Sequence, residues 1–219
     1  MSNQIIERAF NYKECSDLND KAKPSFIAGA RREQIIEAAI KTLDEIGYVK
    51  TSLSQIAKRA GISTALISYH FSDKHDLMDQ LLTRLIEMST AYIKDSVSRE
   101  QNSQAQLDAF IRASLTYQHT YPERSTALVE IVFHVRTSDH VPYYKLQDDS
   151  EDEQMALLRS ILSEGQKKGE FGSFHIDVLA SFIQGAIGEY MLHTGITKKV
   201  SLEVYATQLI HIVNRAMQC

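Results

Sequence analysis

Proline and glycine are scarce in this sequence of 219 residues, which holds 3 prolines and 9 glycines and has no glycine between Gly61 and Gly165. Long stretches without either residue favour helices over a β architecture, which needs many turns. We therefore expect an all-α fold. The length suits a small domain joined to a larger one.

Long apolar runs and paired cysteines are also lacking. No segment approaches the roughly 20 apolar residues that span a bilayer, and the first twenty residues lack the basic start and apolar core of a secretory signal. Cys15 and Cys219 lie in polar or terminal sequence and indicate neither a disulfide framework nor a cysteine metal site. These absences predict a protein of the reducing cytoplasm with no membrane partner.

The motifs of common enzymes are missing as well. The eight histidines are scattered, and the sequence has no HExxH or GxSxG motif and no glycine-rich phosphate loop. We therefore expect no enzyme activity, no cofactor and no metal. Two alternatives stay open. A helical-bundle enzyme would carry a bound metal or cofactor, and a helical protein–protein adaptor would show no salt-dependent affinity for DNA.

Positive charge is in deficit overall, since the net charge is −4, but it gathers near one end. Between Lys21 and His75, nine basic residues stand against five acidic ones, whereas from Asp76 onward 13 basic residues stand against 19 acidic ones. A basic segment on an acidic body is typical of a protein that meets phosphate at one end. Random scatter would also give an asymmetry of this size, so it decides nothing alone.

Apolar residues at helical spacing predict a helix over residues 31–47 that ends at Gly47. We expect the polar residues 1–24 to form an arm or a short extra helix, and Pro24 to break the chain before the next helix. Ser52 with Gln55 makes a capping box for a helix that starts near residue 53. Further helices are predicted at about 64–70, 74–98, 105–120, 124–137, 149–168, 175–195 and 202–217.

Residues 56–71, IAKRAGISTALISYHF, carry the most informative pattern. Ala57 supplies a small residue where two steeply crossed helices approach each other, and Gly61 accepts the left-handed backbone of a tight turn. The isoleucines at positions 56, 62 and 67 fall where the two helices share a core. Any helical hairpin has such residues at its bend, but here the caps agree in register too. The spacing predicts a helix-turn-helix, whose second helix enters the major groove of DNA.

This pattern resembles the TetR family of regulators over about residues 31–82, most specifically in the run YHFSDK that ends at Lys74 and is followed by Leu77. The helix-turn-helix is most similar to that of the choline-responsive repressors of glycine-betaine synthesis. The family commonly has Tyr where this chain has Ser68, and Thr where it has Leu66. The resemblance implies an N-terminal arm (1–24), a DNA-binding domain (25–75) and a helical effector-binding and dimerisation domain (76–219).

The resemblance also implies which residues contact DNA. Thr51 and Ser52 would offer hydroxyl and backbone N–H groups to a phosphate, and Lys74 would anchor another. Short side chains on the second helix would each make one hydroxyl contact or meet a thymine methyl. Tyr69 and His70 would touch the flanking DNA backbone, although packing stays open for both, and we expect Phe71 to be core. The implied set is Arg31, Arg32, Thr51, Ser52, Ser63, Thr64, Ala65, Ser68, Tyr69, His70 and Lys74.

One short recognition helix reads few base pairs, so such modules pair across a two-fold axis, with half-sites roughly 34–36 Å apart. Apolar residues lie almost all round the helix predicted at 177–193, which therefore should be buried on every side. With the last helix it would form a homodimer interface, although an intrachain core remains the alternative. The predicted interface residues are Phe182, Ile183, Ala186, Tyr190, Tyr205, Leu209, Ile212 and Val213.

The family's second half usually encloses a small-molecule pocket. Aromatic walls with a few polar tips suit a medium-sized, partly apolar effector, and a glutamate could balance a cationic one, although most such aromatics are also good core residues. The effector would shift the helix at 74–98 and release a repressor from a palindromic operator. The predicted pocket residues are Phe110, Ser114, Tyr117, Tyr121, Phe133, His134, Glu130 and Glu189.

Overall fold

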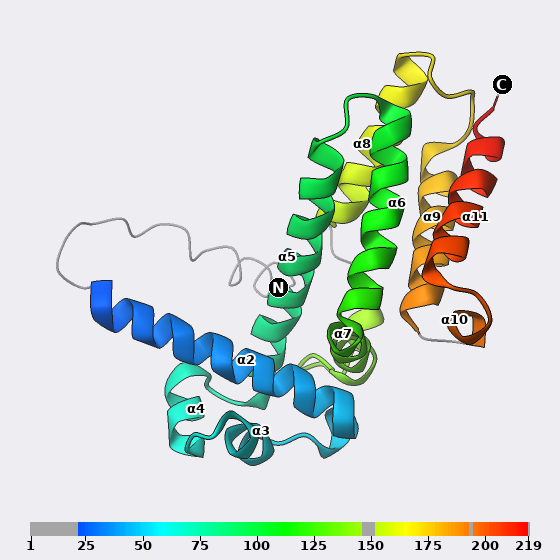
Figure 1. Cartoon of the computed structure of the whole chain (residues 1–219). Helices are drawn as coiled ribbons and strands as arrows, with labels where there is room; N and C mark the ends of the chain where they lie inside the picture. Colours follow the sequence, from blue (N-terminus) through cyan, green and yellow to red (C-terminus); the bar gives the residue numbers. More distant parts are fainter. Residues whose placement is uncertain (1–21, 146–151, 193–194, 219) are drawn as a thin grey trace. The chain divides into compact units, whose positions relative to one another are not determined.

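The computed structural model describes residues 22–145, 152–192 and 195–218 (Figure 1). Within these ranges there is no strand, only an isolated antiparallel bridge between Arg136 and Pro142. None of the described helices combines the length and the apolar character that crossing a membrane requires. The expected all-α class is confirmed. The helices are α2 (Ala22–Lys50), α3 (Leu53–Ala60), α4 (Thr64–His70), α5 (Lys74–Ser98), α6 (Ser103–Thr120), α7 (Pro122–His134), the 3-10 turn η1 (Tyr143–Lys145), α8 (Glu153–Lys167), α9 (Ile176–Met191), α10 (Gly195–Lys199) and α11 (Leu202–Ala216).

The described chain divides into two compact units. The first holds residues 22–85 and 126–145, and the second holds residues 86–125 and those from 152 onward. The division falls inside α5 and inside α7. The DNA-binding domain expected over residues 25–75 is therefore part of a larger unit, because the start of α5 and the end of α7 share its core.

Side-chain caps set the starts of the helices around the central turn. Ser52 accepts a hydrogen bond from the Gln55 N–H at 3.3 Å, and Ser63 accepts one from the Leu66 N–H at 3.2 Å. Asp73 caps α5 in the same way, through the N–H three residues further on. Each cap satisfies a backbone N–H that has no partner inside the helix. For this reason α3, α4 and α5 begin where the sequence predicts.

Helix α2 begins earlier than predicted. It starts at Ala22, so that Pro24 lies in its first turn, where the N–H that proline lacks would have no partner inside the helix. The expectation that Pro24 breaks the chain is wrong for this reason. The regular path of α2 is interrupted at Gly47, with φ 71° and ψ 168°. The remainder of the predicted arm, residues 1–21, lies outside the described residues.

In the second half the helices lie near their predicted positions; α6 starts two residues earlier than predicted, and the others are shorter. Helix α7 ends at His134, and the chain then turns, with the Thr137 N–H donating to the Val141 carbonyl at 2.9 Å. His140 adopts a positive φ of 61° in this turn. Neither η1 nor α10 is predicted, because both are too short for periodicity to reveal.

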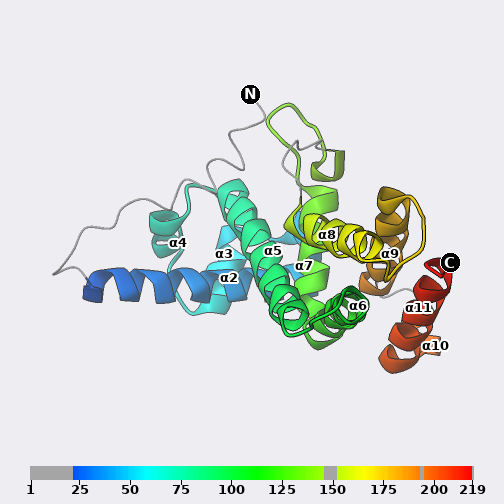
Figure 2. The same cartoon turned by 90° about the horizontal axis from the view of Figure 1, so that it is seen from above.

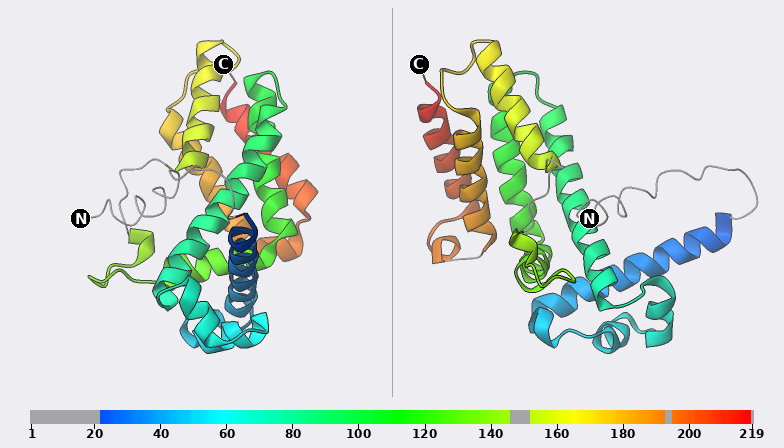
Figure 3. Two further views of the ribbon diagram at one scale, coloured as in Figure 1. Left: turned by 90° about the vertical axis from the view of Figure 1, so that its left-hand side faces the viewer. Right: turned by 180° about the vertical axis from the view of Figure 1, so that it is seen from behind.

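The core of the first unit holds side chains from α3 and α4 and from the longer helices α2 and α5. Helices α3 and α4 lie on the same side of α2 (Figures 1 and 3). Ile56 of α3 and Ile67 of α4 are fully buried, and Phe71 is 1% exposed, which confirms its predicted core position. Ala127 and Ile131 bring α7 into the same cluster. The helix-turn-helix therefore rests on a core to which residues far along the chain contribute.

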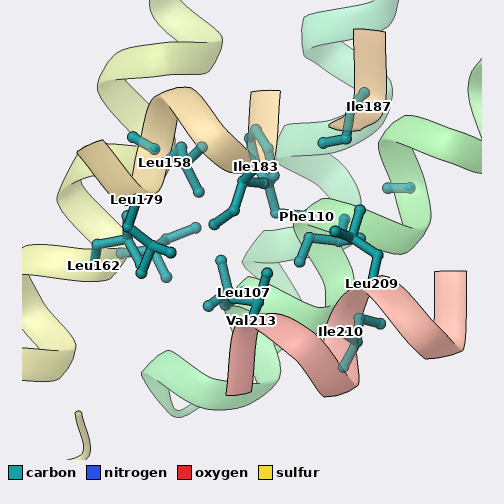
Figure 4. Packing of buried hydrophobic residues seen from close by; sticks show 14 of the residues in the cluster. Leu107, Phe110, Leu158, Leu162, Leu179, Ile183, Ile187, Leu209, Ile210 and Val213 are labelled. Atoms are coloured by element: carbon teal, nitrogen blue, oxygen red, sulfur yellow. The ribbon is translucent and has the colours of Figure 1, made fainter. Parts of the chain in front are cut away.

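The second unit is a helical bundle in which α6 packs against α8, α9 and α11 (Figure 2). Figure 4 shows its apolar side chains converging from these four helices. Phe110 and Ile183 are fully buried within it. The labelled members are Leu107, Phe110, Leu158, Leu162, Leu179, Ile183, Ile187, Leu209, Ile210 and Val213.

Candidate nucleic-acid interface

The turn between α3 and α4 has the geometry that the sequence predicts. Gly61 lies in the left-handed region, with φ 67° and ψ 32°, and its N–H donates to the Lys58 carbonyl at 3.3 Å. The next N–H, that of Ile62, donates to the Ala57 carbonyl at 3.0 Å. These two bonds satisfy carbonyls at the end of α3 and turn the chain sharply into α4.

Helix α4 has one buried and one exposed face. Ile67 anchors the buried face, whereas Thr64, Ala65 and Ser68 are exposed on the other. Tyr69 is 80% exposed, and its ring meets the half-buried His70 edge-on at 5.0 Å. Ser63 is also exposed, with its oxygen engaged as the cap of α4. Exposed residues in the first turn of the second helix match the geometry of a helix-turn-helix, in which those residues approach base edges.

At the start of α3, the two predicted phosphate contacts differ. Ser52 is exposed, but Thr51 is 3% exposed and its hydroxyl donates to the Gly47 carbonyl at 2.7 Å. The Thr51 hydroxyl is thus consumed in closing the end of α2. We withdraw Thr51 as a hydroxyl contact to DNA.

Lys74 differs from its expected role as a solvent-facing phosphate anchor. Its ammonium donates to the Tyr48 carbonyl at 2.7 Å and lies 3.8 Å from the centroid of the Tyr48 ring. Burial lowers the pKa of Lys74, because the charged form loses hydration. Two of the three ammonium protons remain for another acceptor, so this lysine first closes the end of α2 and can contact a phosphate only as a second task.

The two arginines in the middle of α2 both have hydrogen-bond partners within the first unit. Arg31 donates to the Gln34 side chain at 2.7 Å. Arg32 bonds to the side chain of Gln80 and stacks over the Phe71 ring at 5.0 Å. Arg31 is exposed and its guanidinium keeps further N–H donors for a phosphate, whereas Arg32 is half-buried against its two partners.

Tyr48 contacts residues of both α5 and α7, which the sequence does not reveal. Its N–H donates to Oε2 of Glu130 at 2.7 Å, and its ring stacks on that of His134 with centroids 6.4 Å apart. A hydrogen bond to a charged carboxylate is stronger than one between neutral groups. Glu130 and Lys74 therefore fix the chain between Gly47 and the first turn of α3 from two sides.

Glu130→Gln is expected to lower the free energy of unfolding by about 1 kcal/mol, because the amide forms a weaker bond with the Tyr48 N–H. Chemical denaturation measures the loss, and hydrogen exchange should be faster at the Tyr48 amide. Glu123→Gln, on the same helix, is the matched control and should leave hydrogen exchange at the Tyr48 amide as in the parent. Equal exchange at Tyr48 in both variants would contradict the assignment.

Two carboxylates on α5 have opposite environments. Burial raises the pKa of Asp79, against the lowering effects of a 2.5 Å hydrogen bond from the Tyr143 hydroxyl and of His75. Burial alone would also raise the pKa of Asp76, but hydrogen bonds from Gln80 and Ser72 outweigh it and hold the pKa below its ordinary value. Because the two pKa values shift in opposite directions, neutralising each carboxylate should change the stability in opposite directions.

Asp79→Asn is expected to raise the melting temperature at pH 7. A carboxyl group whose pKa is raised in the folded state favours folding at a pH below its ordinary pKa of 3.8, and this contribution is lost as the pH rises through the pKa of the folded state. At pH 7 the buried charge of Asp79 is therefore unfavourable, and the neutral Asn removes it. Asp76→Asn should lower it at pH 7, because a lowered pKa stabilises the fold above 3.8. Both differences should shrink as the pH falls toward 3.8 and below. A lower melting temperature for Asp79→Asn at pH 7 would show that burial does not dominate at Asp79.

The residues predicted to line an effector pocket belong to two different units. In the first unit, Phe133 is exposed, with its ring 5.4 Å from that of Tyr144, and His134 is exposed too. Glu130 already holds the Tyr48 N–H. We therefore withdraw Glu130 as the counter-charge of a cationic effector.

In the second unit, Phe110 and Ser114 are buried in the core. The Ser114 hydroxyl donates to the Phe110 carbonyl at 2.7 Å and so already has a partner. Tyr117 and Tyr121 have ring centroids 5.0 Å apart, and Glu189 is exposed on α9. A cavity of about 460 Å³ opens elsewhere in this unit, and none of its lining residues is predicted. They are Gln104, Glu170, Phe171, Gly172, Asn214, Met217 and Gln218.

The predicted dimer residues divide between two faces of α9 and α11, which lie side by side (Figures 1 and 3). Phe182 and Ile212 are 50% and 52% exposed. Tyr205 donates to the Ala186 carbonyl at 2.7 Å and so ties the two helices together. Four others are wrong as interface residues, because they are no more than 6% exposed within their own chain: Ile183, Tyr190, Leu209 and Val213.

The sequence reasoning missed two apolar residues on the outward face. Val178 of α9 is 66% exposed and Val204 of α11 is 51% exposed. Val178 lies one turn before the predicted Phe182, and Val204 lies two turns before the predicted Ile212, each on the same side of its helix. Helices α9 and α11 thus bury one side in the core of their own chain and expose apolar residues on the other.

Residues 35–81 match the tetR family of bacterial regulatory proteins. A probable helix-turn-helix transcriptional regulator of Bacillus subtilis, YttP, is 28% identical over 142 residues, which are 64% of this chain and 67% of that protein. The transcriptional regulator BetI of Escherichia coli is 29% identical over 142 residues, 63% of this chain and 69% of BetI. The fold is similar to that of the transcriptional regulator FadR of Bacillus subtilis in complex with stearoyl-CoA, with a TM-score of 0.67, 19% identity, and coverage of 85% of this chain and 99% of that one.

These relatives are transcriptional regulators and not enzymes. The match at residues 35–81 spans α3, α4 and the sharp turn at Gly61 between them. It also ends inside α5, which packs on the same core. Residues 35–81 of the first unit thus carry the DNA-binding domain of the TetR family of bacterial regulatory proteins, and the chain is similar to transcriptional regulators of that family.

Proposed function

We propose that this regulator represses transcription as a homodimer that binds an operator with two half-sites and is released by a small-molecule effector. The observation that carries the proposal is the exposed face of α4, formed by Thr64, Ala65, Ser68 and Tyr69 on a helix anchored by the buried Ile67. Ser52 and Ser63 are exposed beside it. Binding of DNA would take place in the cytoplasm.

The outward face of α9 and α11 supports pairing of two chains. Val178 and Phe182 lie one turn apart on α9, and Val204 and Ile212 lie on one side of α11. All four are at least half exposed, and exposed apolar residues that gather on neighbouring helices are typical of protein–protein interaction sites. The exposed Gly185 on the same side of α9 would allow a second helix to approach closely. We propose this face as the dimer interface.

We place the effector in the second unit. The rings of Tyr92, Tyr117 and Tyr121 form a chain of contacts there, with centroids 5.5 and 5.0 Å apart, and the Arg124 guanidinium lies 4.3 Å over the Tyr121 ring. Aromatic rings beside a cation suit an apolar molecule with an anionic end. Because FadR of Bacillus subtilis was solved with stearoyl-CoA, acyl-CoA thioesters are the first effectors to test.

Selection of bound fragments from the source genome tests the function. We expect enrichment of fragments with two related half-sites, and an affinity that falls at least about 100-fold between 50 and 200 mM salt. Addition of the matching effector should release the fragment. An affinity that is independent of salt would favour the adaptor alternative and contradict the proposal.

A further inference from the structure

We infer that the first turn of α4 recognises its half-site through the C5-methyl groups of thymine and not through bidentate hydrogen bonds to guanine or adenine. The inference rests on the proposed binding of operator DNA. It goes beyond that proposal because it names the chemical group that is read and the two residues that read it, Thr64 and Ala65.

The position of these two residues carries the first step. In helix-turn-helix proteins, the N-terminal residues of the recognition helix approach the base edges. Thr64 and Ala65 are the first two residues of α4, and both are exposed, while Ile67 holds the opposite face in the core. Each presents one methyl group. Ser68, one turn after Thr64, adds a hydroxyl that can make a single hydrogen bond.

Bidentate hydrogen bonds to a base need particular side chains. Arginine or lysine reads guanine in this way, and asparagine or glutamine reads adenine. Helix α4, TALISYH, contains none of these residues. On α3, Gln55 is bonded to Ser52, and Lys58 is exposed on the helix that crosses the phosphate backbone in such motifs.

The arginines of the first unit are bonded to neighbours of their own. Arg59 pairs with the Glu45 carboxylate and donates to the Thr42 hydroxyl at 3.1 Å. Within residues 22–85 and 126–145, each of the other arginines also has a partner. These are Arg31 with Gln34, Arg32 with Gln80, Arg84 with Glu33, and Arg136 with the carbonyls of Phe133 and Val135.

Thymine is the one base that displays a methyl group in the major groove. Burial of a group of this size changes an affinity by about fourfold. Apolar contact from Thr64 and Ala65 would therefore favour thymine at the positions facing the first turn of α4. The discrimination would accumulate over two half-sites.

Uracil substitution tests this directly. We take a selected genomic fragment and replace thymine by deoxyuridine within the half-sites, which removes the methyl and keeps the base pair. We expect about fourfold weaker binding for one facing thymine, and about 15-fold when the same position is replaced in both half-sites. The same replacement outside the half-sites is the matched control and should change nothing.

A protein variant assigns the effect to α4. Thr64→Ser removes the methyl and keeps the hydroxyl, so the penalty for deoxyuridine should shrink at one position, whereas Thr120→Ser, exposed on α6, should leave the penalty intact. Full affinity with deoxyuridine in both half-sites would overturn the inference, as would a larger loss from 7-deazaguanine. If no unmodified genomic fragment binds, the proposed function itself fails.

Discussion

A chain with both Phe182→Glu and Ile212→Glu is expected to be monomeric at micromolar concentration and to bind a fragment with two half-sites at least about 100-fold more weakly. Both side chains are at least half exposed in the single chain, so the substitutions cost little in folding. In a dimer they would bury two charges per subunit without partners, at several kcal/mol. Sedimentation and fluorescence anisotropy measure the two effects.

The control for this variant is Ile86→Glu, which places the same charge on a residue of α5 that is 41% exposed. It should leave the mass and the DNA affinity unchanged. Circular dichroism should show parental helicity in both variants. A double variant that stays dimeric would show that α9 and α11 do not form the interface.

Gly165→Ala is expected to destabilise the second unit by about 2–3 kcal/mol and to lower the melting temperature by about 5–10 °C. The chain folds back after α8, where the Phe171 N–H donates to the Gly165 carbonyl at 3.1 Å. An added Cβ would lie 2.1 Å from Cδ2 of the Phe171 ring. That ring is 5% exposed and packs in the core, so it has little room to move.

Gly29→Ala is the matched control, because a Cβ at this position of α2 meets nothing within 4 Å. Alanine is the better helix former, so this variant should gain up to about 1 kcal/mol. Urea denaturation measures both variants. If Gly165→Ala is as stable as the parent, the close approach of Phe171 is wrong.

The features that the sequence predicts well are local ones. The bond between Ser52 and Gln55, the cap at Ser63 and the left-handed turn at Gly61 each depend on residues at most five apart. The backbone preference of glycine and the reach of a serine hydroxyl are enough to infer them. The bounds of α3, α4 and α5 follow from the same local chemistry.

The features that the sequence cannot reveal depend on distant partners. Glu130 lies 82 residues from Tyr48, and Lys74 lies 26 residues from it, so no spacing rule joins them. Thr51 looks like a helix-start hydroxyl until the fold turns it onto the Gly47 carbonyl.

Helix α9 shows a further limit. Because it is apolar on both sides, its sequence does not separate the inward Ile183 from the outward Phe182.

Photo-cross-linking at position 69 tests the central claim most directly. A photoreactive phenylalanine analogue replaces Tyr69, which is 80% exposed on α4, and in a second protein it replaces Tyr92, which is 39% exposed in the other unit. With a selected genomic fragment, we predict cross-links from position 69 to bases of both half-sites and none from position 92. Cross-links from position 92 alone would contradict the assignment of α4 as the helix that reads DNA.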